Sequence, residues 1–311
     1  MRAFVFPGQG SQKVGMGVEL AEASAVAREV FEEVDDALGQ KLFQIMKEGP
    51  EDALTLTENA QPAIMANAIA VLRVLEKEGG IALADTADYV AGHSLGEYTA
   101  LCAAGAFTLA DTARLLKLRG QSMQAAVPVG VGAMAALLGI ELEGALEACK
   151  EAAQGEVVAV ANDNGGGQVV VSGHKAAVER TIEAVKPRGS KRGMLLPVSA
   201  PFHCPLMQPA ADAMREALEK VTLSTPNVPL IANVLASEIT NPADIKQRLV
   251  EQVTGMVRWT ESVGWLAGEG GVTDLVELGT GKVLSGLAKR IAPDATAVSV
   301  GLPADVDAFV A

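Results

Sequence analysis

The chain has 311 residues, of which 49% are hydrophobic and 20% charged, and its formal net charge at pH 7 is −13. This composition excludes a disordered chain and supplies enough apolar residues for one large domain with a smaller insert. The negative charge disfavours nucleic acids and anionic membrane surfaces as partners, so an anionic ligand would need a local positive group.

The first 126 residues alternate between strand and helix patterns. Residues 3–6 are predicted to form a short apolar strand, and helical periodicity follows over residues 18–38 and 62–78. A second strand is expected over residues 88–91, followed by a helix over residues 95–104. One more helix is expected over residues 111–124, with Asp111 or Thr112 near its start.

The middle of the chain has a different pattern, strand–helix–strand–strand–helix–strand, which is that of the ferredoxin-like motif. Ser172 is a candidate cap for the second of its helices. We therefore expect a small inserted subdomain at residues 127–197. Its elements are expected over residues 132–138, 141–153, 157–161, 168–171, 175–185 and 193–196.

Alternation of helices and strands resumes beyond this insert, and it favours a mainly parallel sheet. Helices are expected over residues 209–220 and 243–253, and strands over residues 230–233 and 272–277. The predicted fold is an α/β, hydrolase-like core formed by residues 1–126 and 198–311.

Three cysteines, Cys102, Cys149 and Cys204, are too few for a disulfide framework and lack the spacing of a metal site. A reducing, cytoplasmic compartment is therefore expected. The longest uncharged stretch, residues 120–140, contains a proline and four glycines, so no membrane span is expected there.

The segment Gly92-His93-Ser94-Leu95-Gly96 matches the G-x-S-x-G pattern between an expected strand and an expected helix. Glycines on both sides of Ser94 permit a sharp turn that exposes its hydroxyl group. The free N–H groups at the start of the helix favour a developing oxyanion. Ser94 is therefore predicted to be a nucleophile.

A serine nucleophile needs a base, and the chain has only three histidines. The side chain of His93 should point away from Ser94, because the two residues are neighbours in a sharp turn. His203 is favoured because Pro201 and Pro205 stiffen its loop. His174 and the absence of any histidine base remain open. Asp163 could complete a triad, although its surroundings are typical of a turn.

Five segments together resemble the malonyl-CoA:acyl carrier protein transacylases and the related acyltransferase domains of fatty acid and polyketide synthases. The resemblance spans nearly the whole chain. The segments are Phe6-Pro7-Gly8-Gln9-Gly10-Ser11-Gln12, Gly92 to Tyr98, Leu118-Arg119-Gly120 with Met123-Gln124, Pro201-Phe202-His203-Cys204, and Gln252 with Val257-Arg258-Trp259.

The resemblance implies a role for each matching residue. Ser94 would carry the malonyl group and His203 would be the general base, steadied by the backbone carbonyl of Gln252. The backbone N–H groups of Gln9 and Leu95 would form the oxyanion hole. Arg119 would bind the malonyl carboxylate through two parallel hydrogen bonds, a geometry that suits a guanidinium group.

Two further residues bear on substrate choice. Phe202, directly before the histidine, accompanies malonyl rather than methylmalonyl in related domains, and Asn162 is a candidate for lining the site. The implied substrates are a coenzyme A thioester and the phosphopantetheine of an acyl carrier protein. No metal and no tightly bound cofactor is expected. Lys186, Arg188, Lys191 and Arg192 could dock the carrier, since carriers are acidic, or could form an ordinary solvated loop.

Other functions remain open. A serine esterase or thioesterase would share the turn at Ser94, although it would not need a carboxylate-binding arginine. A non-catalytic scaffold would not need both Ser94 and His203. An acyltransferase serving a polyketide synthase instead of fatty acid synthesis would have the same motifs.

Overall fold

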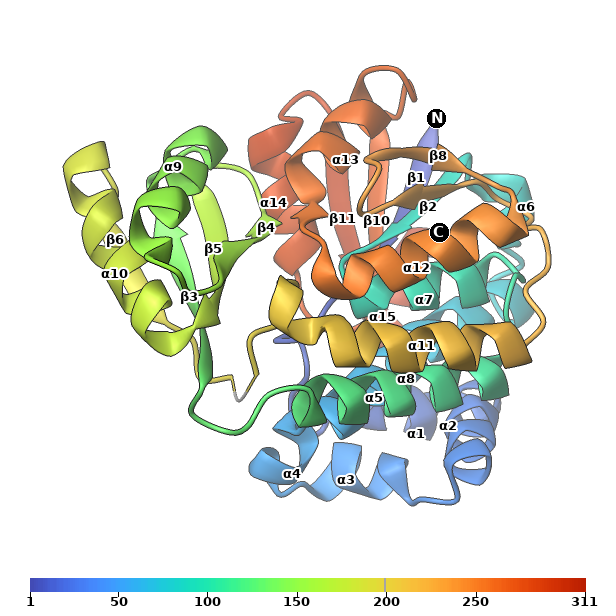
Figure 1. Cartoon of the computed structure of the whole chain (residues 1–311). Helices are drawn as coiled ribbons and strands as arrows, with labels where there is room; N and C mark the ends of the chain where they lie inside the picture. Colours follow the sequence, from blue (N-terminus) through green and yellow to red (C-terminus); the bar gives the residue numbers. More distant parts are fainter. Residues whose placement is uncertain (199) are drawn as a thin grey trace.

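A computed structural model describes residues 1–198 and 200–311 of the chain. The described strands form two sheets. In Figure 1 the large sheet lies in the main body of the molecule, and the small sheet lies in a smaller unit at its side. The strand order is β11-β10-β1-β2-β7-β8 in the large sheet and β6-β3-β5-β4-β9 in the small one.

The large sheet is parallel except for its edge strand β8. Phe4 and Phe6 of β1 pack into a cluster on one face, whereas Ala3 and Val5 pack into another cluster on the opposite face. Burial on both faces is typical of parallel sheets. The strands are β1 (Arg2–Phe6), β2 (Tyr89–Gly92), β7 (Leu230–Ala232), β8 (Ser237–Ile239), β10 (Asp274–Leu278) and β11 (Thr296–Val300).

Helices cover both faces of this sheet, which gives the hydrolase-like α/β core expected from the sequence (Figure 1). The smaller cluster is covered by α13 (Trp259–Ala267) and α14 (Val283–Ile291). The helices of the larger cluster are α1 (Val18–Ala23), α2 (Ala25–Leu38), α3 (Leu42–Glu48), α4 (Glu51–Thr55), α5 (Thr57–Lys77), α6 (Leu83–Thr86), α7 (Leu95–Ala103), α8 (Leu109–Ala125), α11 (Gln208–Lys220), α12 (Pro242–Thr254) and α15 (Pro303–Val310).

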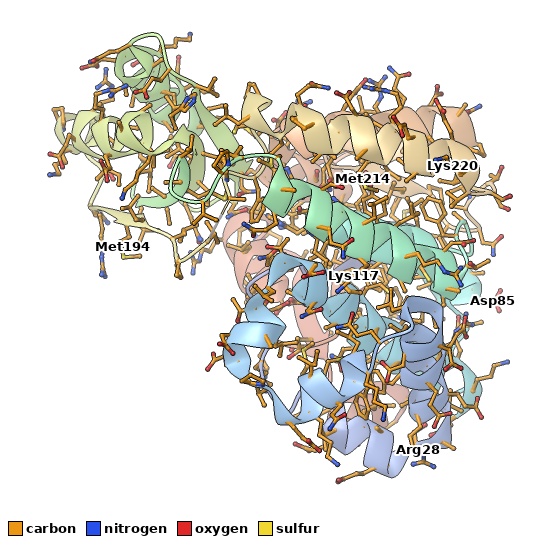
Figure 2. All side chains as sticks on the ribbon, turned by 60° about the horizontal axis from the view of Figure 1, so that its bottom comes forward. Arg28, Asp85, Lys117, Met194, Met214 and Lys220 are labelled. Atoms are coloured by element: carbon orange, nitrogen blue, oxygen red, sulfur yellow. The ribbon has the colours of Figure 1, made fainter. Side chains whose placement is uncertain are left out.

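The small unit has the predicted ferredoxin-like order. Its elements are β3 (Gly132–Leu138), α9 (Leu142–Ala153), β4 (Val158–Asp163), β5 (Gln168–His174), α10 (Lys175–Val185) and β6 (Arg192–Leu195). In Figure 2 this unit, which carries Met194, stands to one side of the core helices that carry Lys117 and Met214. A short core strand, β9 (Val257–Arg258), pairs with β4 and ties the two units together. The limits 127–197 stay a prediction.

Two local expectations were wrong, and one helix begins earlier than expected. Residues 18–38 form two helices, because Ser24 is extended and its hydroxyl group accepts the Ala27 N–H. Helix α8 begins at Leu109, two residues earlier than expected, with Thr108 as its cap and Asp111 in its first turn, near the start as predicted. Ser172 caps nothing, because β5 continues through it, paired with β3, as far as His174.

No helix in residues 1–198 or 200–311 is long and apolar enough to cross a membrane.

Candidate active site

Ser94 lies in the sharp turn between β2 and α7, with a φ of 54° that non-glycine residues rarely adopt. The flanking glycines are required by close backbone contacts. A Cβ atom on Gly92 would lie 1.9 Å from the carbonyl of Gly96, and one on Gly96 would lie 2.2 Å from the oxygen of Phe6. The predicted strained turn is therefore present, and it directs the Ser94 side chain into a cavity.

Asn233, directly after β7, holds this turn from the neighbouring strand. Its Oδ1 accepts the Ser94 N–H at 2.8 Å, and its Nδ2 donates to the Gly92 carbonyl at 2.7 Å. Sequence reasoning missed Asn233. The available signal was a polar residue directly after a buried strand of the core.

His203 is within hydrogen-bond distance of Ser94, with 2.7 Å between Nε2 and the serine Oγ. Its Nδ1 lies 2.8 Å from the carbonyl oxygen of Gln252 and 3.2 Å from that of Gly255. Since carbonyls only accept, Nδ1 carries the proton and Nε2 is free to accept the serine hydroxyl. Burial, with the nearby charge of Arg119, lowers the pKa of His203 to about 3, so the imidazole is neutral at pH 7.

The other two histidines are engaged elsewhere. His93 bonds to the Asn164 side chain at 2.8 Å, and Nδ1 of His174 accepts the Val157 N–H at 2.9 Å. The Asp163 carboxylate accepts the N–H of Gly165 at 3.4 Å, as in a turn. Of the three histidines, only His203 is within hydrogen-bond distance of the Ser94 hydroxyl.

Arg119 is a buried cation beside the nucleophile, with 1% of its surface exposed. Its Nη2 donates to Ser94 Oγ at 3.1 Å and to Gln252 Oε1 at 2.8 Å, and its Nη1 donates to Gln61 Oε1 at 2.8 Å. All three acceptors are neutral. No carboxylate in the described part of the chain lies within ion-pair distance of Arg119.

Glu97 is the acidic group whose charge acts on Arg119, but burial raises the pKa of Glu97 to about 8. Its carboxyl group is therefore mostly protonated at pH 7 and leaves the guanidinium charge uncompensated. Leaving a cation buried without a counter-charge is costly, so the site is suited to bind an anion there.

All the residues that the sequence analysis assigned to catalysis or acyl binding, except Gln252, line one cavity of about 850 Å³ between the core and the small unit. Gln252 contacts Arg119 and His203 from behind the wall of this cavity. The predicted residues that line the cavity are Gln9, Ser94, Leu95, Arg119, Asn162, Phe202 and His203.

Backbone donors are also available in this cavity. The N–H groups of Gln9 and Leu95 donate to no atom of the described residues. Leu95 is also the first residue of α7, where the helix dipole favours negative charge. Both groups are therefore available to an oxyanion formed next to Ser94.

Exposed apolar side chains form part of the mouth of the cavity. Leu56, Val129 and Val283 line it although 50%, 80% and 53% of their surfaces are exposed. They come from three separate segments of the chain. Exposed apolar side chains around a cavity mouth are typical of a binding site.

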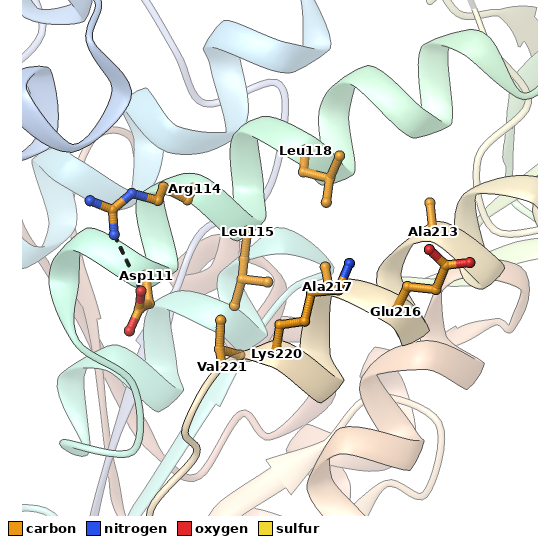
Figure 3. A pocket seen from close by; sticks show the side chains of 9 residues that line it. All are labelled: Asp111, Arg114, Leu115, Leu118, Ala213, Glu216, Ala217, Lys220 and Val221. Carbon is orange, nitrogen blue, oxygen red and sulfur yellow. Dashed lines mark hydrogen bonds and ion pairs between the residues drawn. The ribbon is translucent and has the colours of Figure 1, made fainter.

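A second cavity, of about 400 Å³, lies between α8 and α11 (Figure 3). Asp111 and Arg114 form an ion pair at its edge, and apolar side chains such as Leu115 and Val221 line it. None of its lining residues belongs to the large cavity, and it contains no serine, cysteine or histidine.

The predicted basic group is partly neutralised. Lys186 pairs with Glu183 at 2.5 Å, and Arg188 pairs with Glu151 at 2.8 Å. Lys191 and Arg192 are exposed and form no ion pair with a described residue. Within residues 1–198 and 200–311, no group of three or more His, Cys, Asp or Glu side chains is arranged to hold a metal ion.

Known proteins are similar to this chain over nearly its whole length. The sequence model of the acyl transferase domain family matches residues 3–269 of this chain. The malonyl CoA-acyl carrier protein transacylase of Escherichia coli (strain K12) is 47% identical over 301 residues, 97% of this chain and 96% of that protein.

Solved structures are similar over the same extent. An acyl-carrier-protein S-malonyltransferase from Bartonella henselae has a TM-score of 0.97 and 54% identity, covering 99% of this chain and 98% of its own. A malonyl-transacylase in complex with its type II PKS acyl-carrier protein has a TM-score of 0.95 and 43% identity, with the same coverage. This chain therefore belongs to the acyl transferase family.

Proposed function

We propose that this enzyme transfers malonyl from malonyl-CoA to the phosphopantetheine thiol of an acyl carrier protein, through a malonyl ester of Ser94, in fatty acid biosynthesis. The observation that carries the proposal is Arg119, a buried guanidinium without a carboxylate partner, 3.1 Å from the Ser94 hydroxyl. Malonyl has the free carboxylate that Arg119 lacks, and an acetyl group does not.

In the first half-reaction Ser94 Oγ attacks the thioester carbonyl while Nε2 of His203 takes the hydroxyl proton. The carbonyl of Gln252 holds the imidazole in the required tautomer, as a carboxylate does in other serine enzymes. The N–H groups of Gln9 and Leu95 stabilise the oxyanion. The C–S bond then breaks, and the thiol of coenzyme A leaves with the proton from His203.

The second half-reaction reverses these steps with another thiol. His203 takes the proton of the phosphopantetheine thiol, whose sulfur attacks the malonyl ester, and Ser94 regains its proton as the C–O bond breaks. Water must be kept from the ester meanwhile. Phe202 and the exposed apolar side chains of Leu56, Val129 and Val283 suit that requirement.

Gln252, Phe202 and Asn162 are proposed as supporting residues. Gln252 orients Arg119 through its side chain and His203 through its carbonyl. Phe202 and Asn162 line the cavity and are 8% and 7% exposed. A ring at residue 202 leaves less room for an α-methyl branch, which favours malonyl over methylmalonyl.

The carrier protein is proposed to dock at the basic segment of the small unit. Support comes from the exposed Lys191 and Arg192, since Lys186 and Arg188 already have acidic partners. Reversing the charges of Lys191 and Arg192, as in K191E/R192E, should slow discharge of malonyl-Ser94 to the carrier without slowing formation of malonyl-Ser94. Equal discharge rates in the variant and the original protein would overturn this docking site.

No tightly bound cofactor is proposed, because both half-reactions balance with protein groups and the two thioesters alone. A cytoplasmic location is proposed from the three cysteines, which are all unpaired and buried. A polyketide synthase is the second candidate recipient, because one similar structure contains a type II PKS carrier. Comparing discharge to carriers of both kinds distinguishes the two.

The proposal is tested by the intact mass of the protein after brief exposure to malonyl-CoA, with Ser94→Ala as the control. The expected result is a gain of one malonyl group that is absent in Ser94→Ala and is discharged by carrier protein. Rapid release of free malonate without an adduct would indicate a hydrolase instead. Equal labelling of Ser94→Ala would exclude Ser94 as the acceptor.

A further inference from the structure

Glu97 is a buried carboxyl group that neither half-reaction uses. It follows Ser94 by three residues on α7, and 1% of its surface is exposed. Its Oε2 accepts a hydrogen bond of 2.6 Å from Nε2 of Gln252, and its Oε1 lies 3.4 Å from the backbone nitrogen of Asn233.

The amide of Gln252 is held between groups of opposite character. Its Nε2 donates to the carbonyl of Ser94 at 2.8 Å and to Glu97, while its Oε1 accepts from Arg119. Turning the amide over would place its NH₂ group against the guanidinium, donor against donor. It would also bring Oε1 against the carbonyl of Ser94. Only one orientation of the amide satisfies these neighbours.

We propose that Glu97 is a positioning residue that fixes the side-chain amide of Gln252, and through it the Arg119 guanidinium that selects the malonyl carboxylate. This inference rests on the proposed function and adds a determinant of acyl selectivity. Without Glu97, the NH₂ group of Gln252 keeps the carbonyl of Ser94 at 2.8 Å and only a long contact of 3.5 Å to Asn233 Oδ1. The Oε1 atom of Gln252 and the guanidinium then become free to shift. Binding of a carboxylate through two parallel bonds is sensitive to such a shift.

The protonation state of Glu97 also matters. Because burial raises the pKa of Glu97 to about 8, the group becomes anionic above that pH and then competes with malonyl for Arg119. The titratable groups that interact electrostatically with Glu97 are Arg119 from α8 and Tyr98 on α7. Arg119 also interacts electrostatically with His203. Malonyl loading should therefore fall above about pH 8.

The experiment measures the rate of acyl-Ser94 formation from malonyl-CoA and from acetyl-CoA for E97M, E97Q and the original protein. E97M removes the acceptor at similar size, and its malonyl-to-acetyl ratio should fall about tenfold, the loss expected for one hydrogen bond to a polar partner. E97Q restores an acceptor, so it should recover the ratio at pH 7. It should also lack the fall above pH 8, because its amide does not ionise. E216Q, an exposed change on α11 at a residue that lines the second cavity (Figure 3) and not the large one, is the matched control.

An unchanged ratio in E97M, or an alkaline fall in E97Q as steep as in the original protein, would overturn the role of Glu97. If E97M does not fold, the pH profile of E97Q still decides the matter. Absence of any acyl adduct in the original protein would instead overturn the proposed function itself.

Discussion

Burying the guanidinium of Arg119 costs free energy, and the buried group has a specific use in binding an anion. A guanidinium that is 1% exposed is expensive to bury. Its described partners here are neutral: oxygens of Gln61, Gln252 and Ser94, and the ring of Tyr98 at 5.7 Å. The cost is offset when an anionic substrate enters. This arrangement gives a buried site that is incomplete until a carboxylate binds, which is the basis of rejection of neutral acyl groups.

Replacing Arg119 should therefore alter selectivity more than basal chemistry. We expect Arg119→Ala to lower kcat/KM for malonyl-CoA about 100-fold or more, because two charge-assisted hydrogen bonds are lost. Loading from acetyl-CoA should change much less. Arg119→Lys keeps the charge but not the paired donors, so it should recover only part of the loss. Equal losses for both thioesters would contradict a role in carboxylate binding.

The residues around the nucleophile differ in how visible they are in the sequence. Ser94 and His203 lie in segments with recognisable local patterns, so they could be predicted. Asn233 and Gln61 could not, because their partners are 139 and 58 positions away in the chain. Glu97 was visible only as part of a motif. Its function depends on burial and on a contact with Gln252, 155 positions away.

At the scale of elements, the geometry of the junction between β2 and α7 depends on close contacts between backbone atoms. Helix α7 packs on β1 and β2 so closely that there is no room for a side chain at Gly92 or Gly96. Packing at this distance aims the Ser94 hydroxyl at His203, which comes from a loop before α11.

Adding one methyl group at this junction should be severely destabilising. In Gly92→Ala the new Cβ would lie 1.9 Å from backbone atoms of Gly96, which cannot move without shifting α7. We expect a loss of about 3 kcal/mol or more in the free energy of unfolding, measured by urea denaturation. The matched control is Gly286→Ala in α14, which meets no atom within 4 Å and should gain up to about 1 kcal/mol. Similar effects at the two positions would contradict this account.

Elements were predicted well where periodicity is local. The expected helix over residues 175–185 and the expected strand over residues 132–138 match the observed α10 and β3. Strand β9 was missed, because two residues carry no periodic signal and its partner β4 lies in the other unit. The break at Ser24 was missed because apolar spacing continues across it.

At the scale of the whole molecule, a buried site of this kind makes stability depend on pH in two opposing directions. Burial lowers the pKa values of His93 and His203 from 6.5, so the unfolded chain binds protons below pH 6.5 that the folded one does not. The histidine contribution to stability is therefore lost as the pH falls below 6.5. Glu97 has the reverse effect, because its folded pKa lies above its unfolded one.

The Glu97 contribution can be isolated by comparing the original protein with Glu97→Gln. Between pH 4.5 and about 8 the folded protein holds the Glu97 proton while the unfolded chain releases it, so the stability of the original protein declines through that window. Glu97→Gln has no proton to hold. The difference in unfolding free energy should therefore grow in favour of Glu97→Gln from pH 5 to pH 9, by up to about 4 kcal/mol. Glu216→Gln, at an exposed position on α11, should show no comparable growth.

A difference that stays constant with pH would mean that Glu97 is already ionised in the folded protein. Arg119 would then have a counter-charge of its own, and its affinity for a substrate carboxylate would need another source.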